Sequence, residues 1–143
     1  MTQTQHIHLT IPAMSDYVGV VRLALSGLAS RMNFTVEEIE DIKIAVSEAC
    51  TNAVQHAYEA HEGRIDIDCY CHEDRLEIVV KDQGKGFNMS SLGTPEQKQA
   101  SEEKLGLGLG LAFIQSLMSE ASIESEPGKG TTVRISKTLT PVT

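Results

Sequence analysis

The sequence predicts an α+β fold, a two-layer sandwich with helices on one face of a mixed, mostly antiparallel sheet. Short runs in which apolar and polar residues alternate occur near both ends and in the middle of the chain, as expected for strands buried on one face. Other stretches repeat their apolar residues every three to four positions, which is the period of a helix. No repeat or linker interrupts this order, so we expect one domain over residues 1–143.

A strand and a helix are predicted first. In HIHLTIP, apolar residues alternate with polar ones until Pro12, which indicates a strand that is buried on one face. The helix that follows has apolar residues at spacings of three and four, and we expect Ser15 or Asp16 to be its N-cap. Its apolar face consists of Val18, Val21, Leu25, Leu28 and Met32.

A second helix is predicted from about Val36 to about Tyr58. Thr35 and Glu38 stand in the spacing of a capping box at its start, and Gly63 ends the polar stretch EAHEG that follows it. The apolar stripe of this helix is Ile39, Ile42, Val46, Ala49 and Ala53.

Two antiparallel hairpins and a third helix complete the predicted elements. RIDIDCYC and RLEIVVKD alternate and are joined by polar residues, and ASIESE and TTVRISKTL flank the turn PGKG. The third helix has apolar residues at Leu111, Ile114, Leu117 and Met118. Between Gln83 and about Lys104 the periodicity is lost, which is typical of an active-site lid, although length alone is equally consistent with a disordered insertion.

The composition narrows the functional classes. The formal net charge is −8 and the pI about 5.0, which disfavours direct nucleic-acid binding because phosphate contacts need clustered Lys and Arg. No apolar run is long enough to span a membrane and the N-terminus has no secretory signal, so we expect no membrane partner and a cytoplasmic protein. Cys50, Cys69 and Cys71 lack the second close pair of a zinc site and are expected to be reduced thiols.

One predicted helix carries a polar row on one side. In VSEACTNAVQHAY, Glu48, Asn52 and Gln55 cluster away from the apolar stripe of the helix. Such a row is often a solvated face. The small residues around it, and the asparagine, which is a mediocre helix former, favour a site that a ligand approaches closely.

Two glycine-containing segments add to this row. Asp82 ends a strand in DQGKGF, where Gly84 and Gly86 allow the close approach of a flat ligand. A second segment, GLGLG, stands directly before a helix, where backbone N–H groups can bind an anion. Its glycines are Gly106, Gly108 and Gly110. Each segment alone is also typical of an ordinary turn.

Together the three segments predict a nucleotide site. A carboxylate can bind the exocyclic amine of a base, and a glycine-rich loop can hold phosphates. An amide oxygen can bind Mg²⁺, which prefers hard oxygen ligands. A carboxylate near the terminal phosphate can orient an attacking hydroxyl, because phosphoryl transfer depends mostly on positioning and on stabilisation of charge.

These strings resemble those of a known ATPase superfamily. EACTNA resembles the N box, DQGKGF the G1 box, and LGLGLGL with GKGTTV the G2 region of the GHKL ATPases, which share the Bergerat fold. Nearly the whole chain is similar to the RsbW-like anti-sigma factor/serine-protein kinases of that group. The phosphoacceptor helix pair of a histidine kinase is not found in the sequence.

The resemblance implies roles for individual residues. Glu48 would be the catalytic carboxylate that activates the attacking hydroxyl, and Asn52 would be the Mg²⁺ ligand. Asp82 would read the adenine amino group, with support from Thr131. The other residues implied in nucleotide binding are Gly84 and Gly86 at the base, and Lys104, Gly106, Gly108 and Gly110 at the phosphates, under a mobile ATP lid at about 83–107.

Two further residues are open to two interpretations. Arg22 corresponds to a position that the family uses for partner contact, although a surface arginine is more often simply solvated. His56 either lines the phosphate end of the site or caps the helix.

The resemblance also implies an activity. The protein would be an anti-sigma factor that sequesters a sigma factor as a homodimer and uses ATP and Mg²⁺ to phosphorylate a STAS-domain anti-anti-sigma factor on serine. One alternative is a non-catalytic ATP-binding anti-sigma or adaptor module. The other is the ATPase module of a histidine kinase acting in trans.

Overall fold

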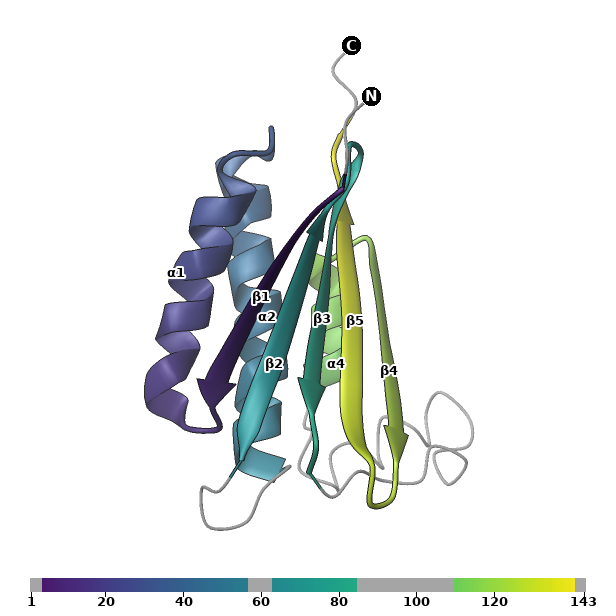
Figure 1. Cartoon of the computed structure of the whole chain (residues 1–143). Coiled ribbons are helices and arrows are strands. Elements are labelled where there is room, and N and C mark those ends of the chain that lie inside the picture. The colour runs from purple at the N-terminus through teal and green to yellow at the C-terminus, as the bar shows by residue number, and fades with distance from the viewer. Residues whose placement is uncertain (1–3, 57–62, 85–109, 141–143) are drawn as a thin grey trace.

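A computed structural model of the chain describes residues 4–56, 63–84 and 110–140, and its five strands form one sheet in the order β1-β2-β3-β5-β4. Every neighbouring pair of the described strands is antiparallel, so the described sheet is antiparallel throughout and not mixed as the sequence suggested. The predicted α+β class is confirmed, as is each predicted strand. The elements are β1 (Gln5–Pro12), η1 (Ser15–Tyr17), α1 (Val18–Ala29), α2 (Val36–His56), β2 (Arg64–Cys71), β3 (Arg75–Asp82), α4 (Gly110–Leu117), β4 (Glu120–Glu126) and β5 (Gly130–Thr138) (Figure 1).

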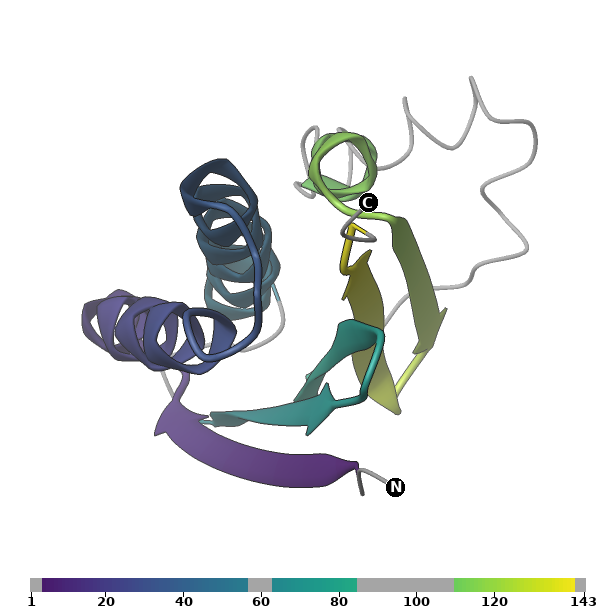
Figure 2. The same ribbon diagram turned by 90° about the horizontal axis from the view of Figure 1, so that it is seen from above.

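The helices form a single layer on one face of the sheet. Figure 2 shows the sheet curling around this layer, with α1 and α2 over one half and α4 over the other. The core lies between the two layers, where apolar residues from both periodic patterns meet. Its largest fully buried side chains include Leu25, Ile42, Ile65, Ile67, Leu76, Ile78, Ile114 and Ile135.

The start of α1 differs from the prediction. Ser15–Tyr17 form a short 3-10 helix, in which the Tyr17 N–H donates to the Met14 carbonyl over 3.0 Å. Tyr17 is therefore the N-cap of α1, without a side-chain cap, and neither Ser15 nor Asp16 has that role. The tighter turn satisfies backbone groups by itself, so it does not need a polar side chain as cap.

The end of α1 also comes earlier than its apolar face suggested. The helix ends at Ala29, and the chain tightens as the Met32 N–H donates to the Ala29 carbonyl over 3.0 Å. Met32 still packs against the core, but from the turn and not from the helix. A side chain in the turn can thus continue the helical spacing of apolar residues beyond the helix itself.

The start of α2 confirms the predicted capping box. The Glu38 N–H donates to the Thr35 hydroxyl over 3.1 Å, and the Thr35 N–H donates to a Glu38 carboxylate oxygen over 2.8 Å. Two of the backbone donors that a helix leaves unpaired at its N-terminus are satisfied in this way. The helix is described as far as His56, and its predicted end at about Tyr58 lies outside the described residues.

The C-terminal end of α4 is attached to both β5 and α2. The Lys137 ammonium of β5 donates to the Leu117 carbonyl over 2.5 Å and lies 3.6 Å from a carboxylate oxygen of Asp41 in α2. A cation at a helix C-terminus satisfies a terminal carbonyl and interacts favourably with the helix dipole. This contact fixes one end of α4 while its other end, Gly110, faces the candidate site described below.

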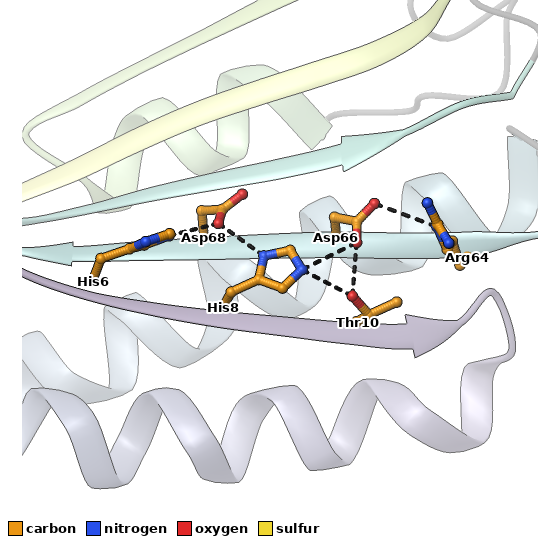
Figure 3. A network of polar contacts seen from close by, with 6 residues as sticks. All are labelled: His6, His8, Thr10, Arg64, Asp66 and Asp68. Carbon is orange, nitrogen blue, oxygen red and sulfur yellow. Dashed lines mark hydrogen bonds and ion pairs between the residues drawn. The ribbon is translucent and has the colours of Figure 1, made fainter.

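A polar network joins the edge strand β1 to β2 on the face away from the helices (Figure 3). One carboxylate oxygen of Asp68 lies 2.7 Å from His6 Nε2 and 2.8 Å from His8 Nδ1. The Thr10 hydroxyl donates to Asp66 over 2.8 Å. Partial burial by itself would raise the pKa of Asp68, but the hydrogen bonds from His6 and His8 hold it below its usual value. The network ties an otherwise exposed edge strand to its neighbour.

The three cysteines are free, as predicted. Cys50 and Cys69 are buried, and burial raises the pKa of each thiol to about 12. Both are therefore neutral side chains of the core at physiological pH. The single domain over residues 1–143, with its lid at about 83–107, stays a prediction.

Candidate functional site

Four elements converge at one end of the molecule. The C-terminal ends of α2 and β3 lie there together with the first residues of α4 and β5 (Figure 1). These ends carry four of the residues that the sequence predicted for a nucleotide site. They are Asn52 on α2, Asp82 on β3, Gly110 on α4 and Thr131 on β5.

Asp82 is a fixed hydrogen-bond acceptor on the helix-facing side of the sheet. Its carboxylate accepts from the Gly84 backbone N–H over 2.9 Å and from the backbone N–H of Thr131, its partner across β3 and β5. Partial burial raises the pKa of Asp82 above its usual value, and these two N–H groups oppose the rise. The residue is thus held in place by its neighbours while being partly removed from water.

Ser125 extends this polar row onto a third strand. It stands opposite Thr131 in the β4–β5 register, so Ser125, Thr131 and Asp82 form a line across three neighbouring strands. The Ser125 hydroxyl lies 2.8 Å from that of Thr131 and 3.1 Å from the Gly130 carbonyl oxygen. The sequence reading missed Ser125. The available signal was a serine at a buried position of ASIESE, where the alternation calls for an apolar residue.

Gly130 allows β5 to begin against the end of β3. Its φ is +84°, in the region that favours glycine, and a Cβ at this position would overlap the Asp82 carbonyl oxygen and lie 2.8 Å from the Gln83 Cα. Any side chain here would push the two strands apart. Gly130 therefore belongs to the support of Asp82, a role that the string GKGTTV did not reveal.

Asn52 lies against the first residue of α4. A Cβ at Gly110 would overlap the Asn52 side-chain nitrogen and lie 3.4 Å from its Cγ. Gly110 is itself buried, and α2 and α4 pack together along this contact. The amide that the sequence predicted as a metal ligand is thus placed next to the helix start that was predicted to hold phosphates.

The donor set of the described residues fits Mg²⁺ bound together with a nucleotide. Within the described ranges, no group of three or more His, Cys, Asp or Glu side chains is arranged to hold a metal ion. Mg²⁺ commonly keeps several waters and uses substrate phosphates with only one or two protein ligands. One amide oxygen from Asn52 is consistent with that kind of site and not with an all-protein metal cage.

Glu48 and Arg22 line one groove between α1 and α2. The groove has a volume of about 460 Å³ and is open to solvent. The Arg22 Nε donates to the Ser47 hydroxyl over 2.9 Å, and that hydroxyl donates to the Lys43 carbonyl over 2.7 Å. Arg22 is therefore oriented by α2 and is not a freely moving surface side chain. The groove is lined by Arg22, Glu40, Lys43, Ile44, Ser47, Glu48 and Thr51.

The remaining predicted residues are only partly described. The backbone of His56 ends α2, and its two predicted roles stay open. Gly84 is described and bonds to Asp82. Gly86, Lys104, Gly106 and Gly108 lie outside the described residues, as does most of the predicted lid.

Three comparisons place this arrangement among known proteins. The profile of the histidine kinase-like ATPase domain matches residues 11–137. Serine-protein kinase RsbW of Bacillus velezensis is 45% identical over 143 residues, which cover 96% of this chain and 88% of that protein. Serine-protein kinase RsbW of Bacillus subtilis is 45% identical over 139 residues, covering 94% of this chain and 86% of that protein.

Solved structures agree with these relatives. A crystal structure of the RsbU and RsbW domains of a Mycobacterium tuberculosis protein matches with a TM-score of 0.69 and 25% sequence identity. The match covers 93% of this chain and 31% of that longer chain. None of the helices in the described ranges combines the length and the apolar character needed to cross a membrane.

Proposed function

This chain belongs to the histidine kinase-like ATPase family, and on that premise we propose that it is an anti-sigma factor that phosphorylates a protein partner on serine with ATP and Mg²⁺. The enzyme is a protein-serine kinase, like the RsbW relatives that it matches over most of its length. The GHKL resemblance in the sequence is confirmed by the family match. The roles of individual residues are proposals that rest on the site geometry.

The base of ATP is assigned to Asp82 and the metal to Asn52. Asp82 offers a carboxylate that is held by two backbone N–H groups, which suits an exocyclic amine as hydrogen-bond donor. Asn52 on α2 lies against Gly110, the first residue of α4. The backbone N–H groups and the dipole at this helix start favour phosphate. When bound, Mg²⁺ and ATP supply the phosphoryl group and the neutralisation of its charge.

The observation that carries the kinase assignment is the position of Glu48. Its side chain lines a groove that is open to solvent, so a serine on a second protein can reach it. Glu48 would orient the seryl hydroxyl and accept its proton as the seryl oxygen bonds to the γ-phosphorus of ATP, while the bond from that phosphorus to the bridging oxygen breaks and ADP leaves. Arg22 lines the same groove and is proposed as a contact for that partner.

Two protein partners are proposed. A STAS-domain anti-anti-sigma factor is the substrate, and a sigma factor is the second partner, held by a homodimer of this chain. Phosphorylation releases the substrate and frees the protein to hold the sigma factor again. Because sigma factors act on RNA polymerase, this proposal places the protein in the cytoplasm and requires no nucleic-acid contact of its own.

The test is phosphoryl transfer from γ-labelled ATP to purified STAS proteins of the same genome. Glu48→Ala should abolish labelling and leave ATP affinity unchanged, because the carboxylate acts on the hydroxyl and not on the nucleotide. Glu40→Ala is the matched control, since Glu40 lines the same groove on the same helix and pairs with Lys43 over 2.9 Å. Labelling of a STAS serine by wild type and Glu40→Ala but not by Glu48→Ala supports the assignment.

The other outcomes decide against parts of the proposal. Undiminished labelling by Glu48→Ala refutes Glu48 as the catalytic carboxylate. ATP binding without any labelled STAS protein across the complete set favours the non-catalytic adaptor. Sedimentation at micromolar concentration tests the homodimer separately, and a monomer that still binds a sigma factor would contradict it.

A further inference from the structure

We propose that Ser125 is a specificity-determining residue, which orients the Thr131 hydroxyl so that the site presents two acceptors to the amino group of a purine base. The inference rests on the proposed function in one respect, namely that the Asp82 end of the site takes the base. It concerns a residue that does not touch the nucleotide and acts through Thr131. Each of the two hydroxyl groups can donate only one hydrogen, and this limits how they can be oriented.

Ser125, Thr131 and Asp82 lie at the same level of the sheet on three neighbouring strands. Thr131 is the register partner of both Ser125 on β4 and Asp82 on β3. Side chains that are directly opposite each other in antiparallel strands share a face and approach closely. The Thr131 hydroxyl therefore lies between the Ser125 hydroxyl and the Asp82 carboxylate, on the helix-facing side of the sheet.

The direction of the hydrogen bonds follows from what each group can donate. The Ser125 hydroxyl lies 3.1 Å from the Gly130 carbonyl oxygen, which can only accept. A hydroxyl has one hydrogen, so donation to Gly130 leaves Ser125 as the acceptor in its 2.8 Å contact with Thr131. Thr131 is then the donor, and its only hydroxyl hydrogen points toward Ser125 and away from the base site.

The consequence is a pair of neighbouring acceptors. With its hydrogen engaged, the Thr131 oxygen presents lone pairs only, beside the acceptor oxygens of Asp82. An amino group at position 6 of a purine has two hydrogens to donate, whereas an oxo group has none. A free threonine hydroxyl could rotate and donate to an oxo group, and Ser125 removes that option. The base site thus rejects a 6-oxo purine at two acceptor oxygens and not one.

The burial of Ser125 supports a dedicated role. Among the residues that the structure describes, Ser125 is the only buried residue with a polar or charged side chain. Only 6% of its surface is exposed. A buried hydroxyl is unfavourable unless it is hydrogen-bonded, and alanine would fit this inward position without that requirement. The hydrogen bonds to Gly130 and Thr131 meet this requirement, and they hold the Ser125 hydroxyl in a defined orientation.

The experiment compares ATP with inosine triphosphate, which differs from ATP in having a 6-oxo group in place of the 6-amino group. Calorimetry on the full chain gives the ratio of the two dissociation constants. In Ser125→Ala we expect the preference for ATP to fall roughly three- to tenfold, as for one lost hydrogen bond. Ser122→Ala is the matched control, because Ser122 is exposed on the opposite face of the same strand. It should keep the wild-type ratio.

A second variant separates orientation from packing. Thr131→Val removes the hydroxyl that Ser125 orients, so it should lower the ratio in the same way. Ser125→Ala added to Thr131→Val should then change the ratio no further, because no hydroxyl is left to orient. A wild-type ratio in Thr131→Val, or an additive effect in the double variant, overturns the inference even if Ser125→Ala is poorly folded.

Asp82→Asn distinguishes this inference from the proposed function. If Asp82→Asn leaves ATP affinity unchanged, the base does not lie at this end and the proposed function loses its base site. If Asp82→Asn weakens ATP binding but Ser125→Ala keeps the wild-type ratio, the base site stands and the role of Ser125 is refuted.

Discussion

Gly110, the first residue of α4, is in direct contact with the side chain of Asn52 on α2. The contact joins two segments that are far apart in the sequence, and it leaves no room for a Cβ at position 110 without displacing the Asn52 amide. The start of α4 follows the predicted lid in the sequence, and Gly110 is the first described residue after that segment. Asn52 can keep its position only if residue 110 is glycine.

Gly110→Ala should weaken Mg²⁺-dependent ATP binding by about tenfold, because Asn52 must rotate away from the added methyl group. Binding without Mg²⁺, measured by calorimetry in the presence of a chelator, should change less. Gly27→Ala is the control, since nothing lies within 4 Å of a Cβ at this interior position of α1. The free energy of unfolding of that variant should be about 0.5–1 kcal/mol higher than that of wild type. Its ATP affinity should be that of wild type. Equal loss with and without Mg²⁺ in Gly110→Ala would contradict the assignment of Asn52.

Asp82→Asn should weaken ATP binding by about ten- to a hundredfold, because an amide replaces a charged acceptor. Wild-type affinity should also fall on acidification at a higher pH than an ordinary aspartate would cause, since burial raises the pKa of Asp82. The pH dependence of the dissociation constant in both proteins checks this. If the ATP dissociation constant of Asp82→Asn depends on pH as that of wild type does, Asp82 does not bind the base.

The same substitution should not destabilise the fold at neutral pH. The pKa of Asp82 is raised in the folded state, so the unfolded chain loses this proton first as the pH rises. Wild-type stability therefore decreases as the pH rises from the unfolded pKa through the folded pKa. Asparagine keeps an acceptor for the N–H groups of Gly84 and Thr131 without the buried charge. The free energy of unfolding of Asp82→Asn relative to wild type should increase between pH 3 and pH 7, as measured by urea titration.

Arg22→Ala should reduce affinity for the protein partner at least about thirtyfold and leave ATP affinity unchanged. Arg22 is oriented by Ser47 beside Glu48, so its loss affects the docking groove and not the nucleotide site. Arg134→Ala is the control, because Arg134 is an exposed arginine on β5 that lies 3.9 Å from Glu124. Surface plasmon resonance with the STAS substrate measures both. Equal losses in the two variants would indicate a general effect of charge.

Thr35→Ala should lower the free energy of unfolding by about 1 kcal/mol at pH 7, because it removes one half of the capping box. The backbone N–H of Thr35 lowers the pKa of Glu38, so the contribution of this carboxylate is present above its unfolded pKa and is lost as the pH falls through the lower folded value. Glu38→Gln should therefore differ from wild type at pH 7 and converge with it in strong acid. Urea unfolding of Glu38→Gln and wild type at both pH values checks this. An equal difference in the free energy of unfolding at the two pH values would refute the role of the charge.

Local patterns predicted the elements well, and the failures have a physical cause. The capping box at Thr35 and Glu38 uses atoms only three residues apart, so spacing alone was sufficient. The prediction of Ser15 or Asp16 as the N-cap of α1 was wrong, because both residues suit a 3-10 turn as well as a cap. Composition does not decide between these two uses of the same residues.

The sequence by itself determined the order of helices and strands, the capping box and the motifs that mark the ATPase family, because period, spacing and residue type are all local quantities. Only the tertiary structure decided that Ser125 and Gly130 support Asp82, and that Gly110 holds Asn52 in place. Likewise, Arg22 and Glu48 share a groove only because α1 and α2 pack side by side. Such relationships depend on strand register and helix packing, which bring together atoms that no local pattern in the chain connects.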